Sequence, residues 1–340
     1  MLENLIFFIF AIILTYVAKK KNLFPNFTGD HHQKFFNEKK IPLIGGILIL
    51  ASLLRFYYND SSFLNFTFIN IFLIGFLSDA KFMSSPKLRL FLQLLIVSSF
   101  VFYFKIEVTP TRLEFFDSIL QNSYLSFLFS IFCFLILING SNFIDGLNGL
   151  LLGYVLLIFL VLNSNHLISF SGLSELEINY LIYSFLLVII LNYLNLLYLG
   201  DSGAYLLGFF TGYLLISIYN SQISISPYYV ILLLWYPCFE NLFSLLRKYF
   251  KAKSPIKPDN KHLHQLIFLF FKSKIKSENI MITNIFSSLM INFFNLIIFI
   301  IASKNPNLTF LQIKLIILSI FIYCLVYYFL NKKFYSRSKK

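Results

Sequence analysis

The sequence predicts an all-α polytopic membrane protein that crosses the bilayer about eleven times. Composition, the length of the apolar runs and the placement of the basic residues support this fold class. Of the 340 residues, 58% are hydrophobic and 13% are charged, whereas a soluble domain has roughly 45–50% and about 25%. One soluble core cannot bury so much apolar surface, and a disordered chain has little of it. Composition therefore excludes a soluble globular domain and a disordered chain.

Apolar runs between polar breaks give eleven candidate spans. A transmembrane helix needs about 20 such residues, so the shorter runs are expected to extend into flanking polar residues. The first run lacks a basic leader and a small-residue cleavage site, and is therefore an uncleaved span rather than a signal peptide. The predicted spans are Asn4–Ala18, Ile44–Tyr58, Phe63–Leu77, Leu88–Phe104, Tyr124–Ile138, Gly149–Asn163, Ile178–Leu199, Gly203–Tyr219, Tyr228–Leu246, Ile282–Ala302 and Leu308–Leu330.

The basic residues predict the orientation of these spans. With the N-terminus outside and the C-terminus in the cytoplasm, all but five of the 28 lysines and arginines fall on the cytoplasmic side. The five exceptions are Arg55, Lys105, Arg112, Lys304 and Lys314. Such a bias is typical of cytoplasmic loops. The net charge of +13 therefore indicates topology, and no nucleic-acid partner is expected. The basic tail 331–340 is expected to bind anionic lipid headgroups.

The polar segments on the predicted cytoplasmic side differ from ordinary connecting loops because they gather the ionisable groups. We expect one integral-membrane domain, 1–340, whose catalytic loops are 19–43, 78–88, 139–149, 200–203 and 247–280. Asp79, Asp145 and Asp201 follow three separate spans or begin the next one. Ionisable residues at such positions are costly and often functional.

Three neighbouring carboxylates would repel one another, and a divalent cation would relieve the repulsion. Mg²⁺ prefers oxygen ligands and often joins one or two carboxylates to a substrate phosphate, and lysines suit the same phosphate. This combination indicates phosphoryl transfer. The plainer interpretation is that each aspartate caps a helix and that His262 and His264 are ordinary loop residues. A transporter or lipid flippase is the rival function, although no internal repeat is visible.

The motifs occur in a fixed order along the chain. They are Ser78-Asp79, Asn139-x-x-Asn142-x-x-Asp145-Gly146, Gly200-Asp201-Ser202-Gly203 and Pro258-Asp259-x-x-His262-x-His264. From about Pro42 to Gln265 the chain resembles the polyprenyl-phosphate N-acetylhexosamine-1-phosphate transferase family (glycosyltransferase family 4). It is most similar to the branch that starts O-antigen, enterobacterial common antigen and teichoic acid linkage. The sequence departs from the family pattern where Ser78, Asn148 and Glu240 replace aspartates and Gln265 replaces a histidine.

The resemblance implies transfer of an N-acetylhexosamine-1-phosphate from a UDP-sugar, such as UDP-GlcNAc, to undecaprenyl phosphate, with release of UMP. It implies a site on the cytoplasmic face of the bacterial inner membrane. A catalytically altered family member is the alternative, given Ser78 and Asn148. The expected partners are the UDP-sugar donor, undecaprenyl phosphate, membrane lipid and a second copy of the chain.

The resemblance also implies roles for individual residues. Mg²⁺, with Mn²⁺ as the alternative, would be held by Asp201 and Asp145. The residues with implied catalytic roles are Asp79, Asp145, His262 and His264. The residues with implied contacts to the nucleotide or its phosphates are Asn142, Asn148, Asn192, Lys87 and Lys261.

Overall fold

The computed structural model describes residues 2–25, 41–55, 62–108, 110–250, 261–275 and 280–335. Over these ranges the chain is helical and forms no β-strand. The elements are α1 (Leu2–Lys20), α2 (Gly45–Leu54), α3 (Ser62–Asp79), α4 (Pro86–Phe104), α5 (Glu114–Leu120), α6 (Ser123–Ile144), α7 (Leu150–Ser164), η1 (Leu167–Ser171), α8 (Glu175–Tyr193), α9 (Gly200–Ser221), α10 (Pro227–Leu233), α11 (Trp235–Phe250), α12 (Leu263–Lys274), α13 (Ile280–Ser303) and α14 (Thr309–Tyr335).

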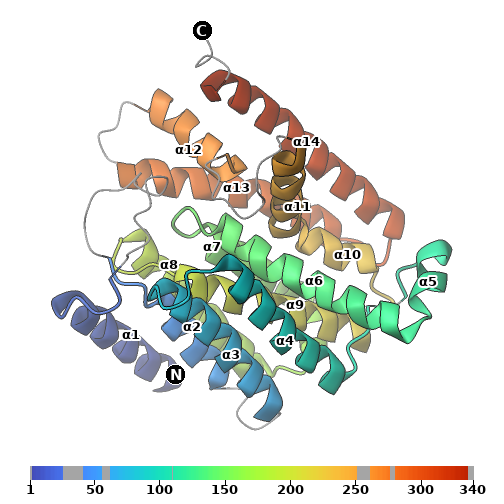
Figure 1. Ribbon diagram of the computed structural model, residues 1–340, viewed down its shortest axis with the longest axis horizontal. Coiled ribbons are helices and arrows are strands. Elements are labelled where there is room, and N and C mark those ends of the chain that lie inside the picture. The colour runs from blue at the N-terminus through green and yellow to red at the C-terminus, as the bar shows by residue number, and fades with distance from the viewer. Residues whose placement is uncertain are drawn as a thin grey trace.

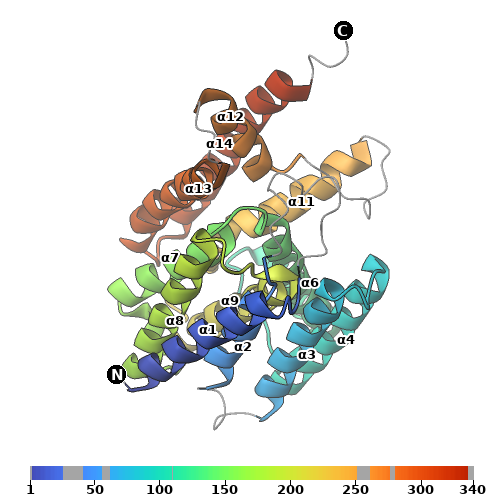
Figure 2. The same cartoon turned by 90° about the vertical axis from the view of Figure 1, so that its left-hand side faces the viewer.

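Helix α9 is the centre of the bundle. Of its 18-residue apolar window, 89% is buried, compared with 22% for α1, α4 and α14. It packs against α2, α3, α6 and α7, and both views show it inside this ring of helices (Figure 1 and Figure 2). Because Gly200 and Asp201 begin this helix, the surrounding helices fix the position of the motif.

The C-terminal helices α12, α13 and α14 form a group beside this bundle, as Figure 2 shows. They pack against one another, and the group joins the bundle where α13 meets α7 and where α14 meets α10. Helix α12 is short and ends in the basic residues Lys272 and Lys274. The sequence did not predict α12 or α5, because both lie outside the apolar runs.

Each predicted apolar run contains helix, but the helices differ in length. Within the described residues, eight helices are long and apolar enough to cross a membrane, and α2 and α7 are shorter apolar helices. Helices α10 and α11 occupy one predicted run and meet at a bend of 73°. The all-α membrane fold is therefore supported, whereas the count of eleven and the orientation stay predictions.

Pro237 explains the break between α10 and α11. Proline has no backbone N–H, so it cannot bond the carbonyl four residues earlier, which belongs to Leu233. The hydroxyl of Tyr154 donates to that carbonyl oxygen at 2.8 Å. A side chain from α7 therefore satisfies the group that the proline leaves free.

Parts of the predicted catalytic loops lie outside the described residues. These parts are 26–40, 251–260 and 276–279, and the end of the basic tail, 336–340, is outside as well. Pro258 and Asp259 of the last motif fall in these ranges.

Candidate functional site

Asp79 holds the N-terminus of α9. It is the buried last residue of α3, and its Oδ1 accepts a hydrogen bond from the backbone N–H of Asp201 at 2.8 Å. Its Oδ2 accepts from the backbone N–H and the hydroxyl of Ser202 at 3.1 and 2.9 Å. Gly200 has φ +73°, and a Cβ there would collide with the Asp79 carboxylate. The capping interpretation of Asp79 is therefore confirmed, and glycine is required for this approach.

Asp201 faces an arginine and a serine from neighbouring segments. Its Oδ2 accepts from the Ser78 hydroxyl at 2.6 Å and from Nη1 of Arg89 at 2.7 Å. The side chains of Asp201 and Arg89 are 22% and 21% exposed, so a solute can reach the ion pair. Arg89 was not among the predicted site residues. The signal was available, since Arg89 lies in the polar break that follows Asp79.

Asp145 completes the acidic group. It follows the last residue of α6 as its C-cap. Burial raises the pKa of Asp145 well above its usual range, and the negative charges of Asp201 and Asp79 raise this pKa further. The structure thus brings together the three carboxylates that the sequence places on three separate spans.

His262 is positioned by Glu240, the residue that replaces the family aspartate. The Nδ1 atom of His262 lies 2.9 Å from Oε1 of Glu240, and the Tyr323 hydroxyl donates to Oε2 at 2.7 Å. Glu240 is fully buried, so these bonds satisfy a carboxylate that would otherwise be costly to bury. Glu240 from α11, itself held by Tyr323 from α14, therefore fixes the orientation of the His262 ring.

His264 lies between His262 and the loop that carries Asp145. Its ring stacks on that of His262 with centroids 5.7 Å apart, and a Cβ on Gly146 would collide with its Nε2. Neither ring nitrogen has a hydrogen-bond partner among the described residues. Burial and the neighbouring His262 lower the pKa of His264 to about 3. The His264 imidazole is therefore neutral at physiological pH.

The side-chain amides of Asn148 and Asn192 form hydrogen bonds with other groups of the protein. Asn148 Nδ2 donates to the carbonyl of Asn192 at 2.9 Å and to Oδ1 of Asn195 at 2.7 Å. Asn192 Oδ1 accepts from the backbone N–H of Gly149 at 2.6 Å, and its Nδ2 donates to the carbonyl of Leu197. An aspartate at position 148 has no N–H for these acceptors, which explains the asparagine. Their nucleotide contacts stay predictions.

The other predicted contact residues lie around this end of the bundle. Asn142 is partly exposed in the last turn of α6. Lys87 is exposed in the first turn of α4, two residues before Arg89. Lys261 places its Nζ 4.1 Å from the ring centroid of Tyr335, at the end of α14. Lys87 is thus close in sequence to the acidic group, whereas Lys261 lies beside the C-terminal helices.

The acidic group fits Mg²⁺ only if substrate supplies ligands. Among the residues that the structure describes, no three or more His, Cys, Asp or Glu side chains are arranged to hold a metal ion. Mg²⁺ needs no such cage, because it commonly uses one or two carboxylates, water and substrate phosphate. Burial first, and then the negative charges of Asp201 and Asp79, raise the pKa of Asp145, and a cation bound here would oppose that rise by favouring the ionised carboxylate. Asp201 and Asp145 are the carboxylates predicted to hold such an ion, and the metal stays a prediction.

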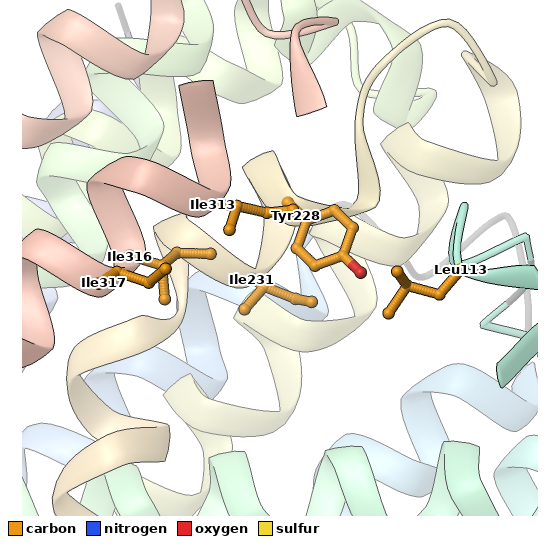
Figure 3. Close-up of a pocket in the computed structure, with 6 residues that line it drawn as sticks. All are labelled: Leu113, Tyr228, Ile231, Ile313, Ile316 and Ile317. Atoms are coloured by element: carbon orange, nitrogen blue, oxygen red, sulfur yellow. The ribbon is translucent and has the colours of Figure 1, made fainter. Parts of the chain in front are cut away.

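An apolar groove lies at the opposite end of the bundle, between α10 and α14 (Figure 3). The described residues that line it include no carboxylate and none of the acidic group. Its lining residues are Leu113, Tyr228, Ile231, Ile313, Ile316 and Ile317.

Comparisons with known proteins agree with the motifs. The family model for glycosyl transferase family 4 matches residues 62–219, which include all three aspartates of the acidic group. The chain is 27% identical over 326 residues to the undecaprenyl-phosphate alpha-N-acetylglucosaminyl 1-phosphate transferase of Thermotoga maritima. These residues make up 96% of this chain and 97% of the relative.

Two further relatives are similar over less of the chain. The protein of the same name from Escherichia coli K12 is 27% identical over 277 residues, 76% of this chain and 72% of the relative. The phospho-N-acetylmuramoyl-pentapeptide-transferase of Dictyoglomus thermophilum is 27% identical over 218 residues, 60% of this chain and 69% of the relative. The match to the family model over residues 62–219, the motifs and these relatives together support a resemblance of the chain to glycosyl transferase family 4.

Proposed function

We propose that the protein transfers an N-acetylhexosamine-1-phosphate from a UDP-sugar to undecaprenyl phosphate and releases UMP. The observation that carries this proposal is the acidic group Asp79, Asp145 and Asp201, which meets Arg89 at one end of an apolar helical bundle. The names of the Thermotoga and Escherichia relatives support the acceptor and the sugar phosphate. UDP-GlcNAc is the proposed donor, with related UDP-N-acetylhexosamines as the alternatives.

The reaction exchanges one phosphoanhydride bond for another. An oxygen of the lipid phosphate attacks the sugar-bearing phosphorus of the UDP-sugar, and the bond from that phosphorus to the UMP oxygen breaks. Mg²⁺ or Mn²⁺, held by Asp201 and Asp145, would neutralise the negative charge that builds up on the diphosphate. The protein contributes mainly by positioning the two phosphates and balancing their charge.

The contacts suggest separate roles for the site residues. Both carboxylate oxygens of Asp79 accept hydrogen bonds from backbone N–H groups at the start of α9, so Asp79 positions Asp201. Asp79 can orient the lipid phosphate only through the lone pairs that these bonds leave free. Glu240 lies beside Nδ1 of His262, which leaves Nε2 to face a phosphate or sugar group. His264, being neutral, serves through hydrogen bonding rather than charge. Lys87 adds an exposed cation two residues before Arg89.

The site is proposed to lie on the cytoplasmic face of the bacterial inner membrane. The basic residues favour that side, and a UDP-sugar is a water-soluble substrate. The undecaprenyl tail would lie among the apolar helices while its phosphate reaches the acidic group.

Product analysis tests the proposed function. Purified protein in lipid nanodiscs receives undecaprenyl phosphate, Mg²⁺ and UDP-GlcNAc, and both UMP and the lipid-linked sugar are measured. We expect equimolar products, none without the lipid acceptor, and a loss of turnover with EDTA. Parallel reactions with UDP-GalNAc and UDP-MurNAc-pentapeptide rank the donors. A transporter, a flippase or a catalytically altered family member would release no UMP from any of them.

A further inference from the structure

Arg89 has bonding capacity that its present contacts do not use. Its Nη1 lies 2.7 Å from Asp201 Oδ2, 2.6 Å from the Ser78 hydroxyl and 3.4 Å from the Tyr205 hydroxyl. Its buried Nε has no partner among the described residues. A guanidinium has five N–H donors in a planar fork that matches the oxygens of a phosphate. Arg89 is thus held by one nitrogen, and a buried donor is left unsatisfied.

The atom that holds Arg89 is also a candidate metal-ligand atom. Asp201 Oδ2 accepts from both Ser78 and Arg89, so a divalent cation that uses this oxygen must compete with the guanidinium. Ser78 contributes a neutral hydroxyl where the family has an aspartate, and the arginine therefore finds one carboxylate here rather than two. Competition between the two cations for Asp201 follows from this geometry.

We propose that Arg89 is a phosphate-binding residue that Asp201 holds in the ligand-free protein, and that a divalent cation on Asp201 releases it toward substrate. The ligand class is a phosphate monoester or diphosphate. The proposal rests on the proposed function only for the source of that phosphate, which is either the lipid acceptor or the nucleotide donor. Competition for Asp201 requires no turnover.

Cation binding without substrate tests the competition. Free Mn²⁺ is measured by electron paramagnetic resonance during titration of the full-length protein in detergent. We expect Arg89→Met to bind Mn²⁺ about five- to tenfold more tightly than the wild type, because it removes a partly exposed competing ion pair. The matched control is Arg55→Met, which removes a guanidinium from the exposed pair with Glu3 and should leave Mn²⁺ affinity unchanged. Equal or weaker Mn²⁺ binding by Arg89→Met overturns the proposal.

A second variant keeps the test informative if Arg89→Met does not fold. Ser78→Asp keeps the arginine but gives it another carboxylate, and it adds negative charge beside Asp201. We expect it to bind Mn²⁺ more tightly than the wild type, whereas Ser78→Asp with unchanged or weaker affinity contradicts the competition. Arg89→Lys retains the charge without the planar fork, so its Mn²⁺ affinity should lie between those of the wild type and Arg89→Met.

Phosphate probes identify the source of the ligand. The affinities for farnesyl phosphate and for UDP are measured by calorimetry at saturating Mn²⁺, with the wild type and Arg89→Met. About a tenfold loss for farnesyl phosphate assigns Arg89 to the lipid phosphate, and the same loss for UDP assigns it to the donor. Unchanged affinity for both probes overturns the phosphate role. If Mn²⁺ competition is present but no UDP-sugar yields UMP, the proposed function fails while the competition for Asp201 stands.

Discussion

Arg89 and Arg112 lie at opposite ends of the bundle and have very different partners. Arg112 Nη2 donates to three successive carbonyls, those of residues 223–225, at 2.9–3.0 Å. Its Nη1 donates to the carbonyl of Asn307 and the hydroxyl of Thr309. This arginine joins the loop between α9 and α10 to the loop between α13 and α14, and these acceptors are all neutral.

Arg89 meets a carboxylate and hydroxyls instead, and its Nε is unsatisfied among the described residues. An arginine saturated by backbone carbonyls stabilises loops, because a ligand would have to break several bonds to recruit it. An arginine held by one nitrogen on a partly exposed acid is available for exchange. The difference in partners therefore separates the structural end of the bundle from the end suited to chemistry.

The largest expected effect is the loss of transfer in Asp201→Asn. The substitution removes the charge that would hold a divalent cation, and we expect turnover to fall by about a thousandfold or more while the protein stays folded in the membrane. UMP release measures it. The matched control is Asp117→Asn at the other end, where Oδ1 accepts from the N–H and hydroxyl of Thr111. Near-normal turnover in Asp201→Asn would contradict the metal assignment.

Glu240→Gln should lower kcat by about ten- to a hundredfold, because the residue fixes the ring of His262. Tyr323→Phe removes only the second bond to Glu240 and should cost less. Rates are measured at saturating substrate, and intrinsic fluorescence checks folding. Full kcat in Glu240→Gln would show that the orientation of His262 does not matter for transfer.

Arg112→Met should lower stability rather than catalysis. The loss of its hydrogen bonds should cost about 2–3 kcal/mol, which corresponds to a fall in Tm of roughly 3–4 °C for a chain of this length. Thermal unfolding in detergent measures this fall, and turnover per folded molecule should be unchanged. A drop in turnover larger than the loss of folded protein would make this end part of the catalytic machinery.

The smallest expected effect concerns Asp145 and pH. The folded protein raises the pKa of Asp145 through burial and neighbouring negative charge. A raised pKa gives stability that is present below the unfolded pKa and is lost as pH rises through the folded value. Asp145→Asn should therefore raise Tm at pH 7 by roughly 2 °C, with the gain shrinking toward pH 4. A Tm difference that does not depend on pH would contradict the electrostatic cause.

Much of the fold follows from the sequence. The predicted apolar runs all contain helix, because lipid-facing and buried positions require the same apolar residues. The bend between α10 and α11 was not predicted, since both helices lie in one apolar run and only Pro237 hints at it. Helices α5 and α12 were missed because they are too short to produce an apolar run of membrane length.

The site was only partly predictable. The convergence of Asp79, Asp145 and Asp201 follows from topology, since alternate loops share one side of the membrane. The contacts of Arg89 with Asp201 depend on how α4 packs beside α3 and α9, which composition does not determine. The nucleotide contact of Asn192 stays a prediction, whereas the hydrogen bonds of its amide with Gly149 and Leu197 were not predicted. Such pairings depend on loop geometry rather than on residue type.

The burial of α9 has a consequence for how the protein responds to different lipids. Helices that touch lipid tilt or shift when bilayer thickness changes, and α1, α4 and α14 are the least buried of the long helices. Helix α9 is almost wholly enclosed by protein, so its neighbours set the depth of Asp201. The outer helices can thus adapt to a thinner or thicker membrane while the acid that begins α9 keeps its distance from the water interface.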